Sequence, residues 1–133
     1  MTIQELFLDQ DHNCAEAVLL WAKDRYGLPL APGDARLVSG FGGGLGCGET
    51  CGALLGALAA LSLALVKERA HATPGFQTAC AQLVDRFRAD LGSIQCTELK
   101  EKYRRPDVRC LHVVERAAAV LDQCMQEQEA AHD

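Results

Sequence analysis

The sequence has little of what marks the larger functional classes. Aromatic residues make up 5% of its 133 positions, and 13 basic side chains stand against 18 acidic ones, a net charge of −5. The densest basic stretch, residues 100–109, is interrupted by Glu101 and Asp107, and such a stretch is typical of a solvated surface. Because no basic stripe could neutralise several phosphates, we expect no nucleic-acid partner.

Targeting and membrane-spanning patterns are missing as well. Residues 1–11 have no basic start, no long apolar stretch and no cleavage site, so we expect no secretory signal and a cytoplasmic protein. The longest apolar run, residues 53–66, is shorter than the roughly 20 residues that cross a bilayer. Charged residues 67–69 follow it directly. We therefore expect no association with a membrane.

The usual catalytic and nucleotide-binding motifs are also absent. There is no Ser-His-Asp order and no HExxH, so hydrolase chemistry has no support. The glycine-rich segment 40–52 follows no predicted strand, and Glu49 stands where a Walker motif needs lysine. No CxxCH is present, so attached haem is not implied. Whether the chain is an enzyme stays open.

What the sequence does contain is helical periodicity. Apolar residues recur at three- and four-residue spacing, and no run of alternating β-branched residues occurs. The length fits a single domain, residues 1–133. We therefore predict an all-α fold, a compact bundle of about five main helices around a central buried apolar helix at about 51–67, with a Gly-rich loop before it. The expected helices span about 12–26, 34–39, 53–66, 75–91, a short segment from about 96, and about 107–128.

Glycine is concentrated just before and within the central helix. Eight of the 12 glycines lie between Gly40 and Gly56, which indicates a loop with unusual dihedrals or close backbone contact. Small residues spaced four apart give the central helix one smooth face, which a neighbouring helix can approach closely. This face consists of Gly52, Gly56, Ala60 and Ala64.

Cysteine is the compositional anomaly. An odd number of cysteines without a secretory signal fits a disulfide scaffold poorly, because the cytosol keeps thiols reduced. Metal binding or redox chemistry is the leading interpretation, although free cysteines are also common core residues. Cys80 and Cys124 lie in the middle of predicted helices, and we interpret both as core residues. The seven cysteines are Cys14, Cys47, Cys51, Cys80, Cys96, Cys110 and Cys124.

Four of these cysteines share a position near a predicted helix start. A bundle can bring several helix starts together at one end, so we predict a common four-thiolate site. Free amides and the helix dipole are expected to lower the pKa of Cys51. Cys47, four residues earlier, is a further candidate ligand, and the amides of Gly43, Gly44 and Gly46 can point at a bound anion or inorganic sulfide. The four cysteines are Cys14, Cys51, Cys96 and Cys110.

The same segments resemble a known family. NCAEAV at 13–18, SGFGGG at 39–44, CGALLG at 51–56 and GSIQC at 92–96, together with Cys110, are similar to the C_GCAxxG_C_C family of redox-active proteins. The resemblance covers about residues 13–121. It implies a small helical protein whose hallmark cysteines are Cys14, Cys51, Cys96 and Cys110. A similar module in split-Soret cytochromes is associated with an iron–sulfur cluster, whereas Cys47, Cys80 and Cys124 lie outside the pattern.

Clustered thiols permit three functions. In the first, the cysteines bind an iron–sulfur cluster and the chain passes electrons to an unidentified redox partner protein. In the second, Cys51 is the reactive thiol of a thiol–disulfide protein and pairs with Cys14, Cys47 or Cys96. In the third, the site holds structural zinc. With no cofactor at all, the cysteines would only fill the core. The apolar surface would also permit a homodimer.

Overall fold

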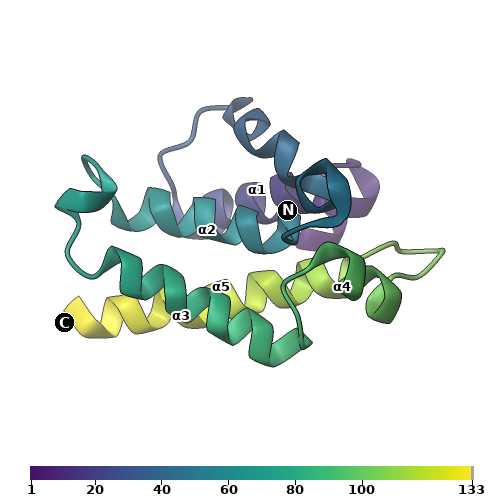
Figure 1. Cartoon of the computed structure of the whole chain (residues 1–133). Coiled ribbons are helices and arrows are strands. Elements are labelled where there is room, and N and C mark those ends of the chain that lie inside the picture. The colour runs from purple at the N-terminus through teal and green to yellow at the C-terminus, as the bar shows by residue number, and fades with distance from the viewer. Residues whose placement is uncertain (133) are drawn as a thin grey trace.

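Five α-helices make up most of the protein, which we describe from a computed structural model covering residues 1–132 (Figure 1). These residues contain no β-strand, so the predicted all-α class is confirmed. The main helices are α1 (Cys14–Tyr26), α2 (Gly52–Leu65), α3 (Phe76–Leu91), α4 (Cys96–Tyr103) and α5 (Leu111–His132). Short helical segments are η1 (Glu5–Asp9), η2 (Asp34–Phe41), η3 (Gly44–Gly48) and η4 (Ala70–Ala72).

The start of α1 is fixed by a reciprocal cap. The Asn13 side chain accepts a hydrogen bond from the backbone N–H of Glu16, and the Glu16 carboxylate accepts one from the N–H of Asn13, both at 2.9 Å. This capping box satisfies two amides that a helix start would otherwise leave free. The helix ends at Gly27, whose φ of 63° is left-handed. Local sequence therefore determines that Cys14 is the first helical residue.

Helices α1 and α2 touch along their backbones. A Cβ atom built on Gly56 would lie 2.5 Å from the carbonyl oxygen of Ala15, and one on Gly52 would lie 2.5 Å from Sγ of Cys14. Neither distance is possible for a real side chain, so glycine is required at both positions. The predicted close approach at the smooth face of α2 is confirmed for these two residues, and it sets the separation of Cys14 from the start of α2.

Helix α2 is central, but it is not buried on every side. Figure 1 shows it running between α1 and the pair α3 and α5. Leu54 and Leu61 are fully buried against these neighbours, whereas Leu55 and Leu63 on the other side are half-buried. The predicted central helix is confirmed, but that side of it is only half-buried. A homodimer through it stays a prediction. Among the described residues, no helix combines the length and apolarity needed to cross a bilayer.

Helix α5 begins later than the periodicity predicted. Residues 105–109 form a tight turn in which the N–H of Arg109 donates to the carbonyl of Arg105 at 2.8 Å, and the N–H of Arg105 donates back at 2.9 Å. These bonds hold the segment out of the helix, which starts at Leu111 and runs to His132 instead of spanning about 107–128. The short segment η1 was also not predicted; it buries Leu6 and Phe7.

The backbone contact between α1 and α2 makes a testable prediction. Gly56→Ala places a methyl group against the Ala15 backbone, and we expect the free energy of unfolding to fall by about 2 kcal/mol, as for other overpacked sites. The measurement is urea denaturation followed by far-UV circular dichroism. Gly40→Ala is the matched control, because a Cβ there meets nothing within 4 Å; its change should stay within about 0.5 kcal/mol. Equal stability of the two variants would contradict the contact.

Candidate functional site

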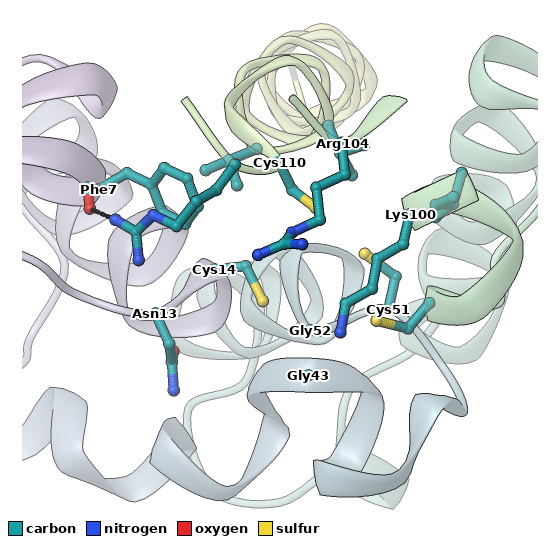
Figure 2. Close-up of a pocket in the computed structure, with 14 residues that line it drawn as sticks. Phe7, Asn13, Cys14, Gly43, Cys51, Gly52, Lys100, Arg104 and Cys110 are labelled. Atoms are coloured by element: carbon teal, nitrogen blue, oxygen red, sulfur yellow. Dashed lines mark hydrogen bonds between the residues drawn. The ribbon is translucent and has the colours of Figure 1, made fainter. Parts of the chain in front are cut away.

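Four of the seven cysteines line one cavity of about 210 Å³, at the end of the bundle where α1, α2, α4 and α5 begin (Figure 2). Cys14 and Cys96 are the first residues of α1 and α4, Cys51 directly precedes α2, and Cys110 directly precedes α5. The predicted position of each near a helix start is confirmed, and the structure brings the four to one place. The cavity is lined by Phe7, Asn13, Cys14, Gly43, Cys51, Gly52, Cys96, Leu99, Lys100, Arg104, Arg109, Cys110, Val113 and Val114.

Two short backbone hydrogen bonds join the segments that carry Cys51 and Cys96. The N–H of Cys51 donates to the carbonyl of Ile94 at 2.7 Å, and the N–H of Cys96 donates to the carbonyl of Glu49 at 2.6 Å. These bonds flank an antiparallel bridge between Thr50 and Gln95. The segment before α2 and the segment before α4 therefore run side by side, and two cysteines 45 positions apart in sequence become neighbours.

An arginine links the segment that precedes Cys14 to the segment that precedes Cys110. The Arg109 guanidinium lies 3.2 Å from a carboxylate oxygen of Asp11. It donates to the backbone carbonyl of Phe7 at 2.6 Å, the dashed line at Phe7 in Figure 2. It also lies over the Phe7 ring, 4.5 Å from the centroid. Asp11 and Arg109 both have left-handed backbones, with φ of 56° and 54°, which is uncommon outside glycine. This clasp joins the chain before α1 to the chain before α5.

Three loop glycines were predicted to take part in the site, and each lies differently relative to the cavity. Gly43 lines the cavity, and its amide faces the sulfur of Cys14. Gly44 packs against Cys96, where a Cβ would lie 2.5 Å from that of the cysteine. Gly46 has no neighbour within 4 Å of where its Cβ would be and does not line the cavity. Of these three glycines only Gly43 lines the cavity, and Gly44 acts by letting Cys96 approach the loop.

The cavity thiols are buried and resist ionisation. Burial raises the pKa of Cys51 to about 12, although the amides of Ala53 and Leu54 at the start of α2 favour its thiolate. The expected lowering of this pKa is therefore wrong, because Cys51 is only 5% exposed and the loss of solvation outweighs the helix amides. Burial is also the largest cause of the raised pKa values of Cys14 and Cys110.

Three basic side chains line the cavity, and the sequence interpretation missed them. Lys100, Arg104 and Arg109 belong to the stretch that was interpreted as solvated surface. The signal that could have found two of them is spacing: Cys96, Lys100 and Arg104 are four residues apart and share one side of α4. Burial and the neighbouring Cys96 and Cys14 raise the pKa of Cys110, whereas Lys100 and Arg104 lower it.

The remaining cysteines lie elsewhere. Cys47 is exposed and does not line the cavity, so the structure does not place this candidate ligand with the other four. Cys124 is buried in α5, as predicted for a core residue. Cys80 is only half-buried on α3, where it lines a surface groove with His71. Its interpretation as a core residue is therefore right only for part of its surface.

The arrangement limits which cofactor the cavity could take. Within residues 1–132, no group of three or more His, Cys, Asp or Glu side chains is arranged to hold a metal ion. Four thiolates on one zinc ion would need to stand about 4 Å from one another, since each sulfur is about 2.3 Å from the metal. In a [4Fe–4S] cluster each thiolate binds its own iron, and in a [2Fe–2S] cluster each iron takes two thiolates, so the four sulfurs as a set spread over a wider space than around one zinc ion. The donor set itself, four cysteines facing one space, fits a cluster; the role of each cysteine as ligand stays a prediction.

The raised thiol pKa values make the stability of the metal-free protein depend on pH. The unfolded Cys51 thiol ionises near its ordinary pKa of 9.0, whereas the folded one keeps its proton up to about 12. The stabilisation is complete below pH 9 and is lost as pH rises toward 12. At pH 10.5 this loss is about 2 kcal/mol for Cys51 alone.

Denaturation of the reduced, metal-free protein at pH 8.5 and pH 10.5 measures this effect. Cys51→Ala should lose less stability over this interval than the wild type, while Cys47→Ala, at an exposed position, should lose as much. Equal losses in wild type and Cys51→Ala would mean that Cys51 ionises normally in the folded protein.

Comparison with known proteins agrees with this arrangement at the level of the family. The family model described as "Putative redox-active protein (C_GCAxxG_C_C)" matches residues 12–124. The matched range includes all four cavity cysteines. No curated protein matches the sequence, and no solved structure does. Because the match spans most of the sequence, the chain belongs to the C_GCAxxG_C_C family.

Proposed function

We propose that the cavity binds an iron–sulfur cluster through Cys14, Cys51, Cys96 and Cys110, and that the chain exchanges electrons with a redox partner protein. The observation that carries this proposal is the convergence of four cysteines from four segments on one cavity of about 210 Å³. Four cysteines are the common ligand set of both [2Fe–2S] and [4Fe–4S] clusters. Such a cluster, when bound, supplies reversible one-electron chemistry.

The surroundings of the sulfurs support this proposal. Amides of Gly43 and Ala15 face the sulfur of Cys14, and those of Ala53 and Leu54 face the sulfur of Cys51. Amide hydrogen bonds to ligand sulfur stabilise thiolates and make the reduction potential of a cluster less negative. The glycine loop and the start of α2 therefore supply amide donors at two of the four ligands.

The apolar part of the lining supports a redox role in a second way. Leu99, Val113 and Val114 are buried side chains on the cavity wall. They limit the access of water to the thiols, and solvent exposure is one of the factors that set cluster potentials. Because ligand thiols must lose their protons, the raised pKa values of Cys14, Cys51 and Cys110 imply that cluster binding releases protons and becomes stronger as pH rises.

The two alternatives gain less from the structure. A reactive thiol needs a low pKa and access to its target, whereas Cys51 is buried and its pKa is raised to about 12. A structural zinc site needs four sulfurs gathered around one ion, and no such group is arranged within residues 1–132. Both remain outcomes of the experiment below.

The compartment and the partner are parts of the same proposal. All seven cysteines, which lie within the described residues, are free thiols. Free thiols of this number suit a reducing compartment, and we propose that the protein is cytoplasmic. The described part of the chain holds one candidate redox site, so an electron that enters must leave to another protein or return to its donor.

The test is the visible spectrum of protein purified without oxygen, together with its iron, sulfide and zinc content. We expect a brown protein with iron and sulfide in equal amounts, bleached by a strong reductant and restored on reoxidation. Serine at Cys14, Cys51, Cys96 or Cys110 should lower the iron content at least fivefold. Cys47→Ser and Cys80→Ser are the controls, and both should keep their iron.

The other outcomes are decisive as well. A colourless protein with one zinc ion per chain would replace the cluster with a structural metal. A colourless, metal-free protein that loses two thiols on mild oxidation would replace it with thiol–disulfide chemistry. Full iron in a cavity variant would remove that cysteine from the ligand set.

A further inference from the structure

Two of the cationic side chains at the cavity have no partner of their own. Arg109 is held by Asp11 and Phe7, but the side chains of Lys100 and Arg104 make no ion pair or hydrogen bond with any residue in 1–132. Both lie on the exposed surface of α4 and its C-terminal cap while lining the cavity. Their charges are therefore free to act on whatever the cavity contains.

Both side chains reach toward the thiols. Figure 2 shows Arg104 extending into the space between Cys14 and Cys110, and Lys100 extending toward Cys51 and the Gly43 segment. Helix α4 explains this direction, since Cys96, Lys100 and Arg104 follow one another at four-residue spacing along it. One helix therefore brings a candidate ligand and two positive charges to the same cavity.

No acidic residue lines this cavity to balance them. The lining consists of cysteines, three basic residues, Asn13, glycines and apolar side chains. Four thiolates in one partly apolar cavity would repel one another strongly, and the cost rises as the local dielectric falls. Positive charges at the opening reduce this repulsion without occupying a ligand position.

We infer that Lys100 and Arg104 are the counter-charges of the cysteine cavity, and that they make the reduction potential of the proposed centre less negative. The second half of this inference depends on the proposed function, whereas the first half concerns the metal-free protein as well. Neither residue touches the reacting atoms as a ligand; both act through charge. The alternative is the original interpretation of the stretch 100–109 as solvated surface without influence on the thiols.

The first experiment measures the electrostatic potential at the cavity in the reduced, metal-free protein. Iodoacetate, an anion, and iodoacetamide, which is neutral, alkylate the same thiolate. The rate with iodoacetate divided by the rate with iodoacetamide at one cysteine therefore does not depend on the fraction ionised, and it rises with positive potential at the sulfur. Peptide mass spectrometry gives this ratio separately for Cys110, in the cavity, and for the exposed Cys47, outside it. At low salt we expect the ratio to be higher at Cys110.

Charge removal provides the comparison. In the double variant Lys100→Gln, Arg104→Gln the ratio at Cys110 should fall about two- to fivefold, the effect of two partly screened charges, while the ratio at Cys47 stays unchanged. Lys102→Gln and Arg105→Gln remove equal charge from the same stretch but do not line the cavity, and they should leave Cys110 unaffected. Lys100→Arg and Arg104→Lys should keep the wild-type ratio. An unchanged ratio in the double variant would overturn the inference.

The second experiment is the midpoint potential of the cluster-loaded protein, measured by titration under an inert atmosphere. The double glutamine variant should have a more negative potential than the wild type, and the charge-conserving variants should match the wild type. If the alkylation ratio falls in the double variant and the midpoint potential does not change, Lys100 and Arg104 attract anions at the cavity opening but do not set the reduction potential. That result would overturn the second half of the inference. If no cluster can be loaded at all, the proposed function fails while the alkylation experiment still decides the counter-charge.

Discussion

The close contact between the backbones of α1 and α2 is the constraint on which the rest of the site depends. Ala15 lies against Gly56, and Gly52 lies against the sulfur of Cys14. A larger side chain at either glycine would push the helices apart and separate Cys14 from Cys51. The glycines therefore serve the packing of the core and the assembly of the thiols at once. The core and the candidate site share one structural cause.

The other two cysteines are placed by loops instead of helix packing. Backbone hydrogen bonds from Cys51 to Ile94 and from Cys96 to Glu49 fix one pair, and the Arg109 clasp with Asp11 fixes the approach of Cys110 to α1. Loop segments usually need such specific bonds, because they bury too little apolar surface to be held by packing. The cavity thus depends on a rigid helix pair and on a few hydrogen bonds that close it.

The sequence predicted the parts of this arrangement that are local. Helix starts follow from capping residues and glycines, which is why the position of Cys14 at the start of α1 could be predicted. Ionisation is not local: the pKa of Cys51 depends on residues from several helices that remove water from it, and helix-start chemistry alone gives the wrong direction. The clasp of Asp11 with Arg109 joins residues 98 positions apart, so no local pattern could predict it. For Lys100 and Arg104 the spacing from Cys96 was visible, but charge density favoured an exposed surface.

The basic residues at the cavity have two different roles: one positions the thiols, and the others balance their negative charge. Holding the thiols in place requires a paired, half-buried cation, and Arg109 has this character, since its guanidinium is fixed by a carboxylate, a carbonyl and an aromatic ring. Balancing negative charge requires an unpaired cation, because a charge already neutralised by a carboxylate contributes little beyond its partner. Lys100 and Arg104 meet that requirement at the same cavity. A chain with a net charge of −5 thus gathers positive charge at the place where its cysteines meet, which is the distribution that an anionic metal–thiolate centre needs.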